Sequence, residues 1–157
     1  MKRSSTREQP EPVFFTDRDL GRTLPAQLRA AGMRIEAYHE HFEPDNVPDA
    51  EWLTFVGKHG WIALSHNKRI RYEREELDDL MTANVKAFFV VGKGPHSAFA
   101  LAFLRSRRRM MRMIRKYPWP FVAKVYQEGD DVELWITREQ WLEGRRRAPR
   151  PGIGQPE

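Results

Sequence analysis

The residues best placed for chemistry are polar side chains next to apolar segments. Asp17 follows the apolar residues 13–15, and Asn67 comes shortly after the apolar residues 61–64. Asp49 opens the helical pattern in front of the second segment. Open α/β sheets bind ligands beyond the carboxyl ends of their strands. Because Mg²⁺ and Mn²⁺ prefer oxygen ligands and keep several waters, two carboxylates and an amide there indicate a cation site.

A structural interpretation of the same aspartates stays open. Asp is common in turns and at helix N-caps, because its side chain accepts hydrogen bonds from nearby backbone N–H groups. Asp17 and Asp49 suit these roles as well as they suit metal binding, and spacing alone does not separate the two interpretations.

Alternating strand and helix patterns must position these residues. Helical periodicity follows Leu20 until Gly32, and the other predicted helices cover residues 49–59, 75–83 and 97–117 and a short segment containing Trp141. Strands are predicted at residues 13–16, 34–38, 61–64, 87–91, 121–126 and 132–136. This alternation predicts an α/β fold with a mostly parallel central sheet, helices on both faces and a C-terminal antiparallel extension.

The two ends of the chain differ from its centre. Residues 1–12 and 144–157 are rich in Arg, Pro, Gly, Ser and Glu and offer little to bury, so we expect disordered tails, the second of them basic. Residues 13–143 form the predicted domain.

Composition excludes several classes of protein. The 157 residues contain no Cys, which rules out disulfide frameworks and thiolate metal sites. No signal peptide is recognisable, and the longest apolar run, Ala87–Val91, is too short for a membrane span, so a cytoplasmic protein without membrane contact is expected. The formal charge of +5 favours a polyanionic partner.

Three segments resemble the PIN-like domains of toxin–antitoxin ribonucleases of the VapC kind: Phe14-Phe15-Thr16-Asp17-Arg18, Pro48-Asp49-Ala50-Glu51-Trp52-Leu53 and Ile62-Ala63-Leu64-Ser65-His66-Asn67-Lys68-Arg69-Ile70. The similarity spans most of residues 13–127. Asp17 and Asp49 match two acidic positions of that family, and Ser65 matches its threonine or serine position. The resemblance implies the three-layer PIN-like fold.

The resemblance also implies an activity. It is hydrolysis of RNA phosphodiester bonds assisted by Mg²⁺ or Mn²⁺, carried out by a type II toxin that a cognate antitoxin protein holds inactive. Asp17 and Asp49 would be catalytic metal ligands, and Glu51 is the best substitute for a further family glutamate, with Glu43 and Asp45 as other candidates. Dimers are common among similar proteins, which leaves a homodimer open.

One position departs from the family. Asn67 stands where an aspartate is expected, and an amide ligates a cation without contributing negative charge. Asn67 is still assigned to the catalytic set, but weaker metal binding is expected. The alternative is therefore a catalytically weakened PIN-like module that binds RNA or a protein partner, and a purely structural α/β protein is the third possibility.

Candidate substrate-binding residues surround Asn67. We expect four residues to contact the substrate: Ser65, Lys68, Arg69 and Arg71. The three cations among them, Lys68, Arg69 and Arg71, would contact its phosphates. His66 is either a loop histidine or a residue for substrate binding or proton transfer. A further basic stripe lies on the predicted helix 97–117 and suits either solvent or an RNA backbone; it consists of Arg105, Arg108, Arg109, Arg112 and Lys116.

Two further motifs carry weaker signals. Gly92-Lys93-Gly94 lacks the full spacing of a nucleotide-binding loop, so a strand-to-helix turn is favoured. His39 and His41 are spaced for one metal ion, but the chain offers no Cys and no third suitably placed His for zinc.

Overall fold

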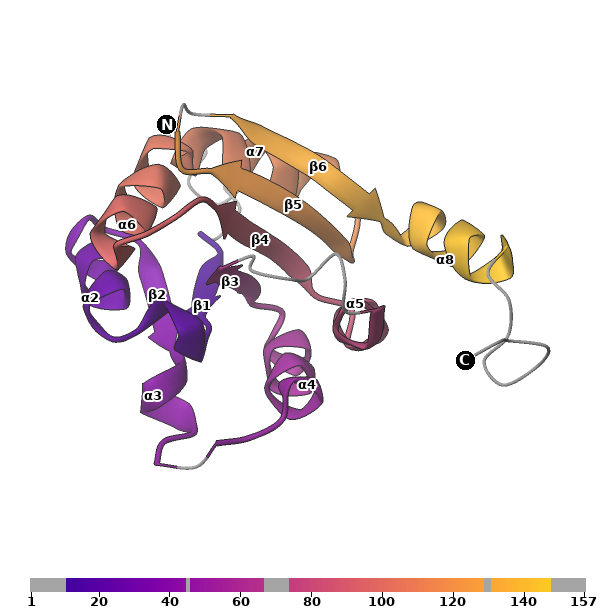
Figure 1. Ribbon diagram of the computed structural model, residues 1–157, viewed down its shortest axis with the longest axis horizontal. Helices are drawn as coiled ribbons and strands as arrows, with labels where there is room; N and C mark the ends of the chain where they lie inside the picture. The colour runs from indigo at the N-terminus through magenta and orange to yellow at the C-terminus, as the bar shows by residue number, and fades with distance from the viewer. Residues whose placement is uncertain (1–10, 45, 67–73, 129–130, 148–157) are drawn as a thin grey trace, which may run out of the picture.

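The computed structural model describes residues 11–44, 46–66, 74–128 and 131–147. Their strands form one six-stranded sheet in the order β2-β1-β3-β4-β5-β6 (Figure 1). The first five strands in this order are parallel, and β6 is antiparallel to β5. The strands are β1 (Val13–Thr16), β2 (Arg34–Ala37), β3 (Ile62–His66), β4 (Lys86–Val91), β5 (Phe121–Tyr126) and β6 (Val132–Thr137). This arrangement confirms the predicted fold class.

The central strands are apolar because both faces of the sheet are covered. Successive side chains of β1 point to opposite faces: Phe14 belongs to one buried cluster and Phe15 to the other. In β4, Phe88 and Phe89 divide between the clusters in the same way. The sheet therefore has two cores, one on each side.

Helices supply the outer layers of both cores. Residues of α2, α6 and α7 pack in the cluster with Phe14, and residues of α4 and α5 pack in the cluster with Phe15. The helical segments are the 3₁₀ helix η1 (Arg18–Leu20), α2 (Thr23–Ala30), α3 (Tyr38–His41), α4 (Asp49–His59), α5 (Arg74–Thr82), α6 (His96–Arg105), α7 (Arg107–Lys116) and α8 (Arg138–Arg147).

The prediction of one continuous helix over residues 97–117 is wrong. It is two helices, α6 and α7, separated at Ser106. Ser106 is completely buried, and its backbone N–H donates to the Ala102 carbonyl. The sequence contains no Gly or Pro at this point, but Ser106 is the N-cap of α7, and serine is a residue type that favours helix N-caps.

The C-terminal helix projects from the body of the molecule (Figure 1). It begins with the predicted capping box: Thr137 N–H donates to Gln140 Oε1 (3.0 Å), and Gln140 N–H donates to Thr137 Oγ1 (3.2 Å). Its Trp141 Nε1 donates to Asp78 Oδ1 on α5 at 2.7 Å, and Arg145 pairs with Asp78 Oδ2 at 3.1 Å. The helix continues to Arg147, past the predicted domain end at residue 143.

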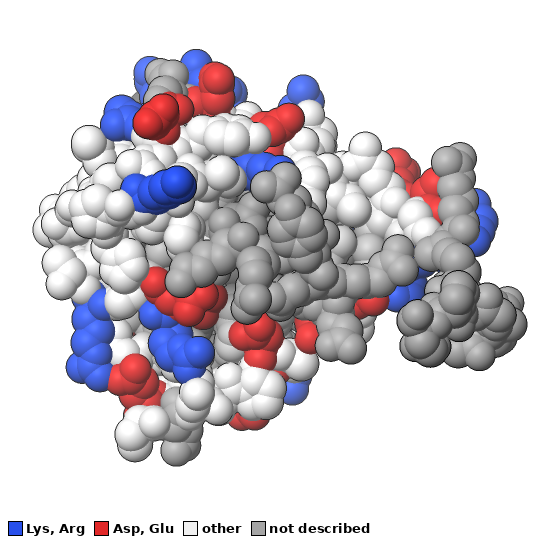
Figure 2. Space-filling view, in the orientation of Figure 1, with Lys and Arg blue, Asp and Glu red and all other residues white. Residues whose placement is uncertain are grey.

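Charges of both signs are mixed on the surface. Figure 2 shows acidic and basic side chains adjoining each other on the face in view. Arg22 with Glu43 and Arg29 with Glu40 are two such ion pairs. None of the helices in the described part of the chain has the length and hydropathy needed to cross a membrane.

Candidate metal-binding active site

Asp17 lies at the carboxyl end of β1, where the chain leaves the sheet. Its N–H donates to the Leu64 carbonyl of the neighbouring strand β3 at 3.0 Å, so the parallel pairing continues to this residue. Its side chain is buried, with 8% exposed, and Oδ2 accepts a hydrogen bond from Ser65 Oγ at 2.7 Å. The carboxylate is therefore held in a defined orientation at the carboxyl edge of the sheet.

The surroundings of Asp17 favour its neutral form. Burial raises the pKa of the carboxyl to about 7, and the negative charges of Asp19 and Asp49 act in the same direction. The Ser65 hydroxyl and the Arg18 backbone oppose this rise in pKa by hydrogen-bonding to the carboxylate. A divalent cation would reverse the balance, because it stabilises a cluster of carboxylates that otherwise repel each other.

Asp49 is the first residue of α4, after the extended Pro48. Its side chain is exposed, and Oδ1 accepts a hydrogen bond from Trp52 Nε1 at 2.9 Å. The N-cap is Pro48, so the N-cap interpretation of Asp49 is wrong. The fold brings Asp49 close enough to Asp17 for its charge to raise the pKa of Asp17, although the two belong to different elements.

Two further carboxylates lie near this pair in the chain. Glu51 is in the first turn of α4 and is exposed. Asp19, in η1, acts on the pKa of Asp17 more strongly than Asp49 does. Sequence reasoning missed Asp19, although its position two residues after Asp17 was a usable signal. Asp19 therefore joins Glu51 as a candidate further ligand.

The end of β3 completes the described part of the site. Ser65 contacts Asp17, whereas His66 faces the next strand: its Nε2 lies 3.1 Å from the Gly92 carbonyl, and its ring centroid lies 4.5 Å from that of Phe99. His66 thus joins β3 to the segment after β4. Its role as a substrate-binding residue stays a prediction.

Several predicted site residues lie outside the described part of the chain: Asn67, Lys68, Arg69, Arg71 and Asp45. Glu43 is described, and its carboxylate pairs with Arg22. That ion pair gives Glu43 a structural partner, so Glu51 and Asp19 are the better candidates for a further metal ligand.

A second group of possible ligands lies at the carboxyl end of β2. Ligand atoms of Glu36, Glu40 and His41 lie within 4.8 Å of one another. Arg29 binds both oxygens of Glu40 at 3.0 Å and, as the largest influence, lowers the pKa of that carboxyl to about 2. His41 Nε2 lies 2.7 Å from Glu36 Oε1. These contacts explain the group as an ion-pair network, so Asp17 and Asp49 remain the favoured metal ligands.

The basic stripe predicted on one helix divides between α6 and α7. Arg105 Nη2 donates to the Gln127 carbonyl at 2.6 Å, and Arg109 pairs with Asp131 at 3.1 Å. Both cations thereby hold the segment that follows β5. The remaining members of the stripe have exposed side chains: Arg108, Arg112 and Lys116.

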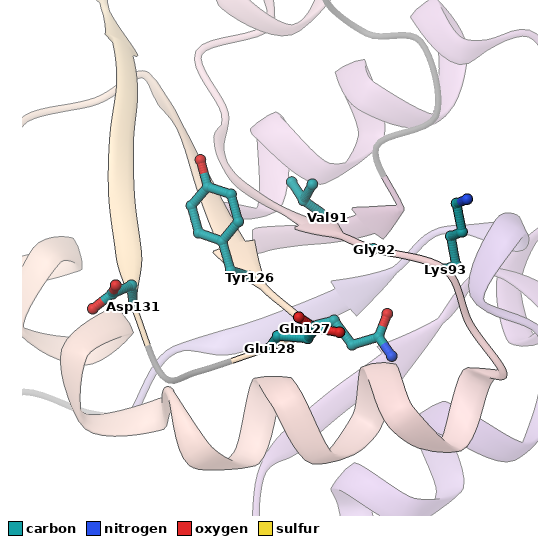
Figure 3. A pocket seen from close by; sticks show the side chains of 7 residues that line it. All are labelled: Val91, Gly92, Lys93, Tyr126, Gln127, Glu128 and Asp131. Carbon is teal, nitrogen blue, oxygen red and sulfur yellow. The ribbon is translucent and has the colours of Figure 1, made fainter.

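A pocket of about 580 Å³ opens beyond β4 and β5 (Figure 3). Its lining residues are Val91, Gly92, Lys93, Tyr126, Gln127, Glu128 and Asp131. Sequence reasoning identified the Gly92-Lys93-Gly94 turn but not the pocket, because its other wall comes from a segment more than thirty residues later. The pocket lies on the same edge of the sheet as Asp17.

Comparison with known proteins agrees with this arrangement. A family model described as a PIN-like domain matches residues 12–92, just over half of the chain. No curated protein and no solved structure matches the chain. PIN-like domains are nuclease-type modules that act on RNA or DNA, generally with divalent metals. The matched residues contain β1 to β4, Asp17 and Asp49, and the chain belongs to the PIN-like domain family.

Proposed function

We propose that this protein is a Mg²⁺- or Mn²⁺-dependent ribonuclease that hydrolyses RNA phosphodiester bonds. The observation that carries the proposal is the buried Asp17 carboxylate, whose pKa is raised by burial and by the charges of Asp19 and Asp49. A buried carboxyl with a perturbed pKa at the end of a strand is typical of a functional site. Membership of the PIN-like family supports a nuclease rather than another metal-dependent enzyme.

The residues present fit a hard divalent cation. Asp17 and Asp49 would hold it, with Asn67 and either Glu51 or Asp19 as further oxygen ligands. A cation held by these residues would lower the pKa of a bound water and would stabilise negative charge on the scissile phosphate. Ser65 orients the Asp17 carboxylate by donating to Oδ2, which leaves Oδ1 as the oxygen not engaged by that hydroxyl.

Substrate would enter along the carboxyl edge of the sheet. Lys68, Arg69 and Arg71 follow β3 directly in the chain, and we assign them to phosphate contacts. Asp17 and Asp49 would bind the metal ion, and no side-chain nucleophile is required. These phosphate contacts suit a nucleic-acid strand, and the resemblance to VapC-type ribonucleases is the support for RNA as the substrate.

Cleavage of labelled single-stranded RNA with added Mg²⁺ or Mn²⁺ tests the proposal. We expect Asp17→Asn and Asp49→Asn each to reduce cleavage at least 100-fold, because each removes a charge from the metal site. Glu139→Gln, an exposed carboxylate on α8, is the matched control and should retain wild-type activity. Cleavage that survives Asp17→Asn would disprove the assigned site.

We further propose that the ribonuclease is the cytoplasmic toxin of a type II toxin–antitoxin pair. The support is the resemblance of three segments to VapC-type proteins, which also suggests a protein antitoxin and a homodimer. Expression in a bacterial host should arrest growth, and Asp17→Asn should abolish the arrest. Co-expression of a protein encoded beside the gene should restore growth by binding the toxin.

A catalytically weakened module that binds RNA or a protein partner is the second candidate. The observation in its favour is Asn67, an amide at a position where the family has an acid. If this candidate is correct, the wild type binds RNA without cutting it, and Asn67→Asp raises metal affinity and produces cleavage. An unchanged rate in Asn67→Asp would exclude Asn67 as the cause of weak activity.

A further inference from the structure

The pocket beyond β4 and β5 continues the proposed catalytic edge. Strands β1, β3, β4 and β5 are consecutive neighbours in the sheet. Because neighbouring strands lie about 4.8 Å apart, β4 and β5 are roughly 10 and 14 Å from β1, the strand that ends at Asp17. Its volume of about 580 Å³ falls within the range of small-molecule sites. A bound RNA strand of a few nucleotides could therefore reach both places.

The walls of the pocket are fixed by contacts from several elements. Gln127 N–H donates to the Val91 carbonyl at 2.9 Å, which ties the end of β5 to the end of β4. Arg105 holds the Gln127 carbonyl, and Arg109 holds Asp131. The pocket is consequently formed before a ligand arrives, which reduces the entropy lost on binding.

Gly92 determines where the Gln127 side chain lies. The glycine has φ +150°, and a Cβ added there would come within 2.2 Å of Gln127 Oε1. Only a residue without a side chain leaves this space to the glutamine. Figure 3 shows the Gln127 side chain extended along the Gly92–Lys93 segment. A side-chain amide is thus held at the pocket, where it can both donate and accept hydrogen bonds.

The other lining groups distinguish a nucleobase from a phosphate. Glu128 places a carboxylate at the pocket that would repel a phosphate group, whereas the charge of Asp131 is paired with Arg109 at 3.1 Å. Tyr126 contributes an aromatic ring, and Lys93 is an exposed cation at the rim. Splayed RNA bases are recognised by aromatic side chains together with polar groups that bond their edges.

We propose that this pocket binds one unstacked base of the RNA substrate, a few nucleotides from the scissile phosphate. This inference rests on the proposed ribonuclease function. Gln127 reads the edge of the base, and Lys93 contacts the adjoining backbone. Because Gln127 Oε1 and Glu128 can both accept hydrogen bonds, the preferred base carries an exocyclic amino group, whose two N–H bonds can serve both acceptors. Adenine and cytosine have such a group, whereas uracil offers only its N3–H.

Binding to short oligouridylates with one adenine or cytosine at each position in turn tests the proposal. The measurement uses full-length Asp17→Asn protein with Mg²⁺ and fluorescence anisotropy, so it requires no cleavage. At one position, adenine or cytosine should bind at least 5-fold tighter than uracil. Gln127→Ala should reduce this preference to within 2-fold, whereas Gln127→Glu, which keeps the acceptor oxygens, should retain it.

A matched control separates the pocket from general effects. Gln27→Ala removes the exposed glutamine of α2 and should keep the full base preference. A preference that survives Gln127→Ala overturns the inference, as does an absence of RNA binding. An affinity for a free nucleoside monophosphate equal to that for the oligonucleotide would also overturn the inference. If wild-type protein cuts no RNA but shows the Gln127-dependent preference, the nuclease proposal fails and the base pocket stands.

Discussion

Ser65 Oγ lies 2.7 Å from Asp17 Oδ2, although 48 residues separate them in the chain. The contact joins the ends of two neighbouring parallel strands, β1 and β3. The hydroxyl donates to a carboxylate that burial and two nearby negative charges would otherwise keep protonated near neutral pH. The balance between these opposing influences leads to the first two predictions.

Asp17→Asn should stabilise the metal-free protein at high pH. The folded-state pKa of about 7 exceeds the ordinary value of 3.8, so the folded protein binds this proton more tightly than the unfolded chain. Wild-type stability from this group is complete below pH 3.8 and is lost as pH rises through 7. The free energy of unfolding of Asp17→Asn, relative to that of the wild type, should rise by about 2–3 kcal/mol between pH 5 and pH 8. Urea unfolding in EDTA measures this difference. An advantage independent of pH would contradict the proposed burial effect.

Ser65→Ala should move metal binding to higher pH. The hydroxyl lowers the pKa of Asp17, so its loss raises that pKa further, and the ionised carboxylate forms only at higher pH. Loss of one hydrogen bond to a charged group corresponds to a shift of about 1 pH unit. Calorimetric titration with Mn²⁺ between pH 6 and pH 9 measures the midpoint. Ser65→Thr keeps the hydroxyl and should restore the wild-type midpoint.

Added Mg²⁺ or Mn²⁺ should raise the melting temperature through Asp17 and Asp49. A ligand at 100 times its dissociation constant stabilises a protein by about 2.7 kcal/mol. Asp49→Asn should remove most of this effect, whereas His41→Ala, in the ion-pair network beside β2, should keep it. If His41→Ala removes the effect and Asp49→Asn does not, the metal binds the group of Glu36, Glu40 and His41 instead.

Asp78→Ala should loosen the attachment of α8 to α5. Asp78 accepts hydrogen bonds from Trp141 and Arg145, and these side-chain bonds join α5 to α8. Because Trp141 Nε1 would lose its partner in a half-buried place, we expect a cost of about 1–3 kcal/mol. Amide hydrogen exchange in residues 138–147 should accelerate, with cleavage activity unchanged. Glu139→Ala on the same helix should leave exchange near the wild-type rate.

The sequence predicted the sheet well because its strands are strongly apolar. Runs such as residues 87–91 have to be buried on both faces, and their alternation with helices leaves few arrangements of the chain. Asp17 and Asp49 could be placed near each other for the same reason, since both were assigned to the carboxyl edge. The residue types at that edge indicated a cation site, and the resemblance to a known family supplied the reaction, which periodicity does not provide.

Other features depend on contacts between distant segments. The break at Ser106 has no Gly or Pro to mark it, and a serine, common at helix N-caps, is only a weak local signal. The high pKa of Asp17 depends on its burial, and Ser65, 48 residues away in the chain, lowers it; neither effect can be inferred from neighbouring residues in the chain. The pocket beyond β4 and β5 is lined by residues from the ends of both strands. Local motifs in the sequence therefore indicate only the Gly92-Lys93-Gly94 segment on one side of it.

The boundary of the family match passes through this pocket. The match ends at residue 92, so Val91 and Gly92 lie inside it, whereas Tyr126, Gln127 and Glu128 lie beyond it. The carboxylates that would hold the metal are entirely within the matched part. If the pocket binds a base as proposed, substitutions in the hairpin of β5 and β6 would alter the choice of RNA while Asp17 and Asp49 stay in place, so selectivity and catalysis could evolve separately.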